Sequence, residues 1–201
     1  MEEMRGLLPA TGANRRPAAT LLPLAAIALM LLMPSTAGAF LVSRVADGHL
    51  VARSDGGSDI IKVSCGTDLL VNVNGLDPST GPTQCGAIKR VRALGFGGVD
   101  TINVTRVGPR NGFTNPALRH GHAVQALGGA SADRITGSRL SDLLAGGAGH
   151  DVLRGRDGDD LLRGGTGGDR LLGGAGDDRL LGGQGRDFLR GGRGNDVEID
   201  L

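Results

Sequence analysis

The sequence has few of the side chains on which most catalytic and nucleic-acid sites are built. Among 201 residues it has no tryptophan, no tyrosine, four phenylalanines and two cysteines. It contains no His-Glu-x-x-His and no Gly-x-Ser-x-Gly sequence, and its Gly-rich turns lack the Lys-Ser/Thr ending of a phosphate-binding loop. The signatures of zinc metalloproteases, α/β-hydrolases and P-loop proteins are therefore missing.

The chain also has no excess of charge of either sign. It carries 22 basic and 21 acidic residues, and without residues 1–39 (which include Arg5, Arg15, Arg16, Glu2 and Glu3) 19 of each remain. This balance argues against nucleic acid as a partner, and the scarcity of aromatic rings argues against base stacking.

The only long apolar run lies near the N-terminus. Arg15 and Arg16 precede the run Leu24–Met33, and Ala37-Gly38-Ala39 fits an A-x-A cleavage site. The run is short for a bilayer span. We therefore predict a signal peptide over residues 1–39 and a secreted, extracellular mature protein without a membrane partner; an uncleaved membrane anchor is the alternative.

What the sequence does have is glycine, arranged in a nine-residue repeat from Gly146 onward. The six copies read GGAGHDVLR, GRDGDDLLR, GGTGGDRLL, GGAGDDRLL, GGQGRDFLR and GGRGNDVEI. Position six is always aspartate: Asp151, Asp160, Asp169, Asp178, Asp187 and Asp196. Position eight is leucine in the first five copies: Leu153, Leu162, Leu171, Leu180 and Leu189.

Each copy divides into a turn and a short strand. Glycines at positions one, two and four permit positive φ angles, and the last three residues alternate outward and inward. Two copies then form one coil of an all-β, right-handed parallel β-solenoid with the leucines stacked inside. A single coil cannot bury its apolar face, which explains why the copies occur in a run.

A coil of two copies sorts the acids into two rows. Row one holds Asp151, Asp169 and Asp187, and row two holds Asp160, Asp178 and Asp196. Stacked carboxylates repel one another unless a cation lies between them. Calcium suits this place because it accepts six to eight oxygens in flexible geometry, whereas magnesium demands an octahedron. Zinc requires Cys or His, and the repeats contain only His150.

The copies resemble the RTX, or hemolysin-type, calcium-binding repeat GGxGxDxUx. The resemblance implies a β-roll in which position-six carboxylates and glycine-turn carbonyls hold Ca²⁺ between stacked turns. The implied ligands are the six aspartates named above together with Gly146, Gly164, Gly173, Gly182 and Gly191. Pairing each turn with the turn two copies later predicts roughly four sites: Gly146 with Gly164, Gly164 with Gly182, Gly155 with Gly173, and Gly173 with Gly191.

Two weaker copies precede the run, so the roll is expected to cover residues 128–201. Asp133 and Asp142 keep the nine-residue phase but lose most of the glycines, and they either bind weakly or cap the roll. Arg156 replaces a position-two glycine and Glu198 replaces a position-eight apolar residue. The sites nearest these substitutions are expected to be the weakest.

Residues 40–127 are expected to form a β-rich segment with a loop over Val107–Ala126. Short β-like runs alternate with turn residues: His49–Arg53, Ile60–Val63, Leu69–Val73, Ile88–Leu94 and Thr101–Val104. Two turns, Gly56–Ile61 and Gly97–Ile102, are similar to the repeat. A degenerate start of the solenoid, a small β-domain packed on its end and an independent β-sandwich all fit these observations.

Cys65 and Cys85 are the only cysteines. In an exported chain an even number of cysteines predicts a disulfide. In the chain-entropy model, closing a loop of this length stabilises the folded state by roughly 3 kcal/mol. Two free thiols are the alternative.

These observations favour an exported, non-enzymatic bacterial protein that folds on binding calcium. The alternatives are a secreted adhesin or matrix protein, a toxin-like protein, and the remnant of an RTX enzyme, since family members with catalytic activity carry it in a large domain ahead of the repeats. An adhesin could bind an acidic polymer or a cell-surface partner through repeat arginines: Arg154, Arg163, Arg170, Arg179, Arg186, Arg190 and Arg193.

Overall fold

The computed structural model describes residues 42–66, 71–73, 83–114 and 121–201. The predicted signal peptide and Leu69–Leu70 lie outside these residues. The described residues belong to one compact unit. Within the described residues, no helix has the length and apolar character needed to cross a membrane.

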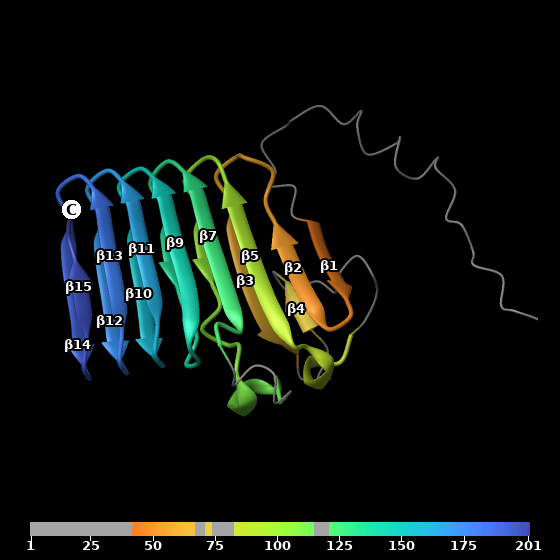
Figure 1. Cartoon of the computed structure of the whole chain (residues 1–201). Coiled ribbons are helices and arrows are strands. Elements are labelled where there is room, and N and C mark those ends of the chain that lie inside the picture. The colour runs from red at the N-terminus through yellow and green to blue at the C-terminus, as the bar shows by residue number, and fades with distance from the viewer. Residues whose placement is uncertain (1–41, 67–70, 74–82, 115–120) are drawn as a thin grey trace, which may run out of the picture. The chain divides into compact units, whose positions relative to one another are not determined.

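The described chain is almost entirely β-structure, arranged as two sheets (Figure 1). The eight-stranded sheet has the order β1 (Val42–Ala46), β2 (His49–Arg53), β5 (Arg90–Phe96), β7 (Val124–Ala130), β9 (Asp142–Ala148), β11 (Leu161–Thr166), β13 (Arg179–Gln184) and β15 (Val197–Ile199). The seven-stranded sheet has the order β14 (Phe188–Arg193), β12 (Arg170–Ala175), β10 (Val152–Asp157), β8 (Arg134–Thr136), β6 (Thr101–Asn103), β3 (Ile60–Cys65) and β4 (Val71–Val73).

From β7 onward the chain alternates between the two sheets, and each strand pairs in parallel with the strand 18 residues later. The register aligns Leu144, Leu162 and Leu180 in one sheet and Leu153, Leu171 and Leu189 in the other. All of these leucines except Leu189 are fully buried. The predicted parallel β-roll, with its position-eight residues stacked inside, is confirmed.

The same two sheets continue upstream of the repeats. Ile61 pairs with Ile102 and Ile102 with Ile135, and all three are fully buried. In the other sheet β2 pairs with β5 and β5 with β7, again in parallel. Residues 40–127 therefore contain the degenerate start of the solenoid, and the expected boundary at residue 128 lies inside β7.

Most of the predicted runs upstream are strands, but two predictions differ from the structure. The loop expected over Val107–Ala126 is wrong at its end, because Val124–Ala126 begin β7. The strand β1 was not predicted; it forms an antiparallel hairpin with β2 through Asp47 and Gly48, both at positive φ.

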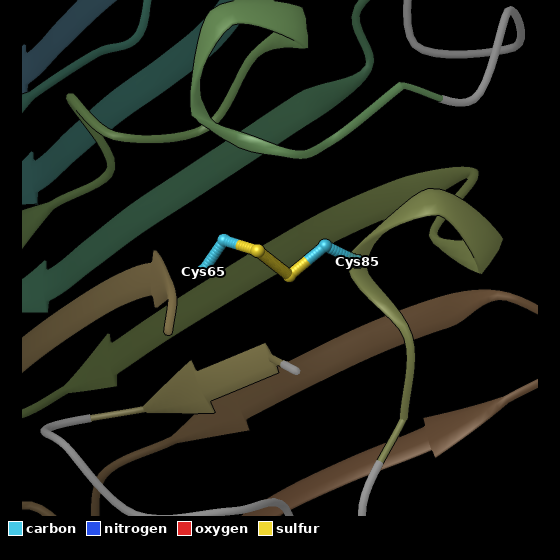
Figure 2. The surroundings of a disulfide bond; sticks show 2 residues. All are labelled: Cys65 and Cys85. Atoms are coloured by element: carbon cyan, nitrogen blue, oxygen red, sulfur yellow. A yellow bond between two sulfur atoms is a disulfide. The ribbon is translucent and has the colours of Figure 1, made fainter. Parts of the chain in front are cut away.

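The predicted disulfide joins Cys65, at the end of β3, to Cys85, in the short 3₁₀ helix η2 (Cys85–Ala87) (Figure 2). Their Cα atoms are 6.0 Å apart, within the usual range for a disulfide. The bond links the upstream coil to the segment that leads into β5.

Position two of the repeat turn requires a backbone that only glycine adopts readily. Gly147, Gly165, Gly174, Gly183 and Gly192 hold this position with φ between 109° and 132°. Arg156 holds it in the second copy and is forced to φ 99°. A left-handed non-glycine residue costs of order 1–3 kcal/mol, so Arg156 is a strained position.

Replacing Arg156 with glycine is therefore expected to raise the free energy of unfolding of the calcium-loaded protein by about 1 kcal/mol. Arg154→Gly, on the same strand but not at positive φ, is the matched control and is expected to lower it by about 1 kcal/mol. Urea denaturation followed by circular dichroism measures both. Equal destabilisation by the two substitutions would show that the backbone at Arg156 is unstrained.

Candidate metal centre

The position-six aspartates form a hydrogen-bonded ladder along each edge of the roll. In every coil one carboxylate oxygen, Oδ1, accepts the backbone N–H of the aspartate one coil earlier, at 2.7 to 3.0 Å. Row one runs through Asp59, Asp100, Asp133, Asp151, Asp169 and Asp187, and row two through Asp142, Asp160, Asp178 and Asp196.

The two rows occupy opposite edges of the roll, because row-one turns follow strands of the eight-stranded sheet and row-two turns follow strands of the other sheet (Figure 1). The rows predicted from the 18-residue coil are thus present, and row one extends two coils further upstream than the weak copies.

The second carboxylate oxygen, Oδ2, is buried and forms no hydrogen bond with any described residue. This holds for Asp100, Asp133, Asp151, Asp160, Asp169, Asp178 and Asp187. A buried carboxylate oxygen without a partner is costly, and native structures contain few of them. Each of these oxygens is therefore suited to a cationic ligand.

Position one of the turn is glycine because Oδ2 lies directly over its Cα. A Cβ added to Gly164 would be 2.4 Å from Oδ2 of Asp169 and 2.5 Å from the carbonyl oxygen of Gly182. The same contacts are 2.1 and 2.8 Å at Gly155 and 2.3 and 2.7 Å at Gly173. A carboxylate oxygen and a carbonyl oxygen from adjacent coils thus converge over each glycine.

This donor set fits calcium. The converging atoms are all oxygens, one anionic and one neutral, as Ca²⁺ prefers. No three His, Cys, Asp or Glu side chains cluster among the described residues. A metal held here must complete its coordination with main-chain carbonyls, which excludes the nitrogen and sulfur geometry of zinc.

The strand register stacks all four predicted turn pairs: Gly146 with Gly164, Gly164 with Gly182, Gly155 with Gly173, and Gly173 with Gly191. Over Gly155, Gly164 and Gly173 the carbonyl oxygen of the partner glycine is among the nearest atoms. Gly146 lies against Oδ2 of Asp151, at 2.2 Å from the added Cβ, and Gly191 lies against Asp196 in the same way. Asp187 and Asp196 are less buried than the other position-six acids.

Asp133 and Asp142 have different environments. Oδ2 of Asp133 converges with the carbonyl oxygen of Gly146 over Gly128, as in the strong copies. Oδ2 of Asp142 also converges with the carbonyl oxygen of Gly155, over Gly137. Asp142 differs because it accepts hydrogen bonds from the hydroxyl and the backbone N–H of Ser138, so both of its oxygens are already satisfied. Asp142 caps row two, and Asp133 has the geometry of a ligand.

Three further aspartates, Asp59, Asp100 and Asp200, lie at the site and were not predicted from the sequence. Over Gly95, Oδ2 of Asp100 converges with the carbonyl oxygen of Gly128, and Asp59 has both carboxylate oxygens buried without a partner. The repeat-like sequences Gly56–Ile61 and Gly97–Ile102 could have identified Asp59 and Asp100 as site residues. Over Gly182, Oδ1 of Asp200 lies where other turns place a carbonyl.

The two substituted copies keep the register of the roll. Arg156 adopts the glycine-like backbone and pairs with Gly174. Glu198 is exposed, and its carboxylate accepts the backbone N–H of Gly191. It therefore forms a polar contact with the last glycine turn at a position where earlier copies bury leucine.

Burial raises the pKa of the ladder carboxylates, and repulsion along the row adds to it. The pKa of Asp160 rises to about 9, first through burial and then through the charge of Asp142. Burial raises the pKa of Asp142 to about 7 and those of Asp133 and Asp178 to about 6, although hydrogen bonds from backbone N–H groups oppose the shift. Burial also raises the pKa of Asp100, Asp151 and Asp169.

The sign of these shifts predicts how the calcium-free roll responds to pH. The folded carboxylates hold protons more tightly than the unfolded ones, so the free energy of unfolding is greatest below about pH 4. It falls as the pH rises through the folded-state pKa values, which are about 6 for Asp133 and Asp178 and about 9 for Asp160. We expect the chain in chelator to show more β-type circular dichroism at pH 4.5 than at pH 8.5, with a smaller difference in the Asp160→Asn/Asp178→Asn variant. A β-type signal that increases with pH would contradict the shifts.

The family comparison agrees with this geometry. The family model of the RTX calcium-binding nonapeptide repeat, in four copies, matches residues 127–162, 136–171 and 163–198. Neither a curated protein nor a solved structure matches the chain. The matched residues contain all six strong copies except the final residue of the last, and both edges of the ladder. Residues 127–198 of this chain are RTX calcium-binding nonapeptide repeats.

Proposed function

We propose that this is an exported, non-enzymatic protein whose β-roll folds when calcium binds between its stacked turns. The observation that carries the proposal is the convergence of an unpartnered Asp Oδ2 and a glycine carbonyl from the next coil, repeated along both edges within the RTX repeats. Calcium bound there supplies positive charge to the carboxylates, while the protein positions the oxygens and excludes water.

The coupling of folding to binding follows from two costs of the empty roll. The chain contains 37 glycines, each of which loses more backbone freedom on folding than other residues. The carboxylates of each row repel one another when ionised. A ligand that binds only the folded state offsets both costs, because its binding free energy adds to that of folding.

We propose roughly four ions in the strong copies, on the turn pairing described above. The turn pairs Gly128 with Gly146 and Gly95 with Gly128 have the same convergence and extend row one upstream. Asp142 is not among the proposed ligands, because Ser138 satisfies its carboxylate.

We propose that the protein is secreted and functions outside the cell. The disulfide supports it, because disulfides persist in oxidising compartments. Extracellular calcium modules bind at about 0.1 to 1 mM, so the roll would fold after export.

Adhesion through an acidic polymer is less well supported. Along the sheet formed by β8, β10, β12 and β14, the register alternates Arg134, Val152, Arg170 and Phe188. Apolar residues thus separate the arginines, and Arg170 stacks on Phe188 at 4.6 Å. The faces of the roll do not present a continuous basic row there.

Calcium titration tests the proposed function. Adding calcium to the chelator-treated full chain is expected to increase β-type circular dichroism and compactness, with binding of roughly four or more ions by calorimetry. No change at 10 mM calcium, roughly ten times the upper end of the expected range, would refute the proposal. Magnesium at the same concentration is the control and is expected to be ineffective.

Asp169→Asn tests the ligand assignment at one carboxylate. Asparagine keeps an Oδ1 that can accept the N–H of Asp151 but replaces the unpartnered oxygen with an amide. We expect calcium affinity to fall by about tenfold or more, while the calcium-free roll becomes more stable because one buried charge is removed. Asp177→Asn is the control, since Asp177 is exposed and its Oδ1 also accepts a backbone N–H one coil away. Equal effects of the two substitutions would argue against Asp169 as a ligand.

A further inference from the structure

An open cavity of about 740 Å³ lies at the row-two edge of the roll. One wall is the segment 105–111, which includes the short 3₁₀ helix η3 (Pro109–Asn111). The other wall is made by two repeat turns, at residues 139–140 and 156–157. In Figure 1 the segment is the green turn near the starts of β7 and β9.

The cavity exists because the regular stack of row-two turns ends here. The connection from β8 to β9 takes only residues 137–141, but the connection from β6 to β7 takes residues 104–123. Val107 and Phe113 are fully buried and anchor the described part of this longer connection to the core. The segment between them overhangs the first repeat turns and does not stack on them.

The walls carry a surplus of positive charge. Four arginines line the cavity, Arg106, Arg110, Arg139 and Arg156, against one acid, Asp157. Asp157 forms a salt bridge with Arg139 at 3.6 Å. Arg156 lies near enough to Asp142 to lower its pKa, but the two form no ion pair. Three guanidinium groups are thus left facing the cavity without a carboxylate bound to them.

One of these arginines, Arg156, has a left-handed backbone conformation that non-glycine residues rarely adopt. Arg156 occupies the position that five other strong copies give to glycine, at φ 99°. Residues kept in such conformations cluster at binding and catalytic sites, where the side chain has a role that glycine could not fill. In this turn the role is to bring a guanidinium group into the wall of the cavity.

We propose that this cavity binds a small ligand that carries two or more oxyanion groups, held by Arg106, Arg110 and Arg156. The planar guanidinium group donates paired hydrogen bonds that match phosphate, sulfate and carboxylate oxygens. The volume is within the range of small-molecule sites and exceeds what a single inorganic ion needs. The proposal rests on the arginines of the cavity wall and not on the proposed function, although Arg156 directly follows Gly155 of the ladder.

Calorimetry on the full chain, with free calcium held constant, tests the proposal. The probes are a hexose bisphosphate, ethane-1,2-disulfonate and propane-1,2,3-tricarboxylate, so that the three arms distinguish phosphate, sulfonate or sulfate, and carboxylate ligands. At least one probe is expected to bind with one-to-one stoichiometry and about tenfold more tightly than methanesulfonate, which has one charged group.

Arg156→Gly is expected to weaken that binding by about tenfold or more while raising the melting temperature, a combination that a purely structural arginine would not give. Arg110→Gln, in the segment outside the repeats, should weaken binding without changing the roll. Arg163→Ala, an exposed arginine outside the cavity, is the control and should bind like the unsubstituted protein.

Three results would overturn the proposal: no binding of any probe, unchanged affinity in both Arg156→Gly and Arg110→Gln, or an equal loss in Arg163→Ala. Calcium stoichiometry measured on the same samples separates the two sites. Loss of oxyanion binding with intact calcium binding concerns only the cavity.

Discussion

The hydrogen bond from each aspartate N–H to the carboxylate of the next coil determines most of this structure. It fixes one oxygen of every position-six aspartate and leaves the other buried over a glycine. Because the bond repeats at each coil, like charges stack at one-coil intervals, and the coils cannot shift relative to one another without breaking the ladder. The same bond that sets the register therefore creates the electrostatic cost that a cation must offset.

The glycines follow from this arrangement. At position one a Cβ would collide with Oδ2, and at position two the backbone requires a positive φ to direct its carbonyl along the coil. In the first four strong copies the leucine at position eight is the only large apolar side chain that is fully buried, so the core is one residue deep in the repeats. Upstream, Val63, Val91, Ile88 and Phe113 deepen the core where glycine is scarcer.

The sequence was sufficient to predict the fold of the repeats, because their period keeps Asp and Leu in phase. It was not sufficient upstream, where paired isoleucines are 41 residues apart at Ile61 and Ile102 and 33 apart at Ile102 and Ile135. These unequal coils hide the period, although Asp59 and Asp100 keep the position-six place in the ladder. The difference between Asp133 and Asp142 depends on the rotamer of Ser138, which no spacing reveals. The arginine cavity depends on a segment that has no repeat pattern.

The ladder also has a direction. Each coil presents backbone N–H groups toward its C-terminal neighbour, and the neighbour brings the accepting carboxylates. The upstream coils, with their deeper core and their covalent crosslink at Cys65 and Cys85, form an end whose donors already point toward the repeats. In a quasi-one-dimensional fold, where each unit contacts only its neighbours, this end supplies the donors for the first repeat coil. The backbone donors of each coil in the ladder are thus satisfied by the coil that follows it, so the two ends of a row are not equivalent.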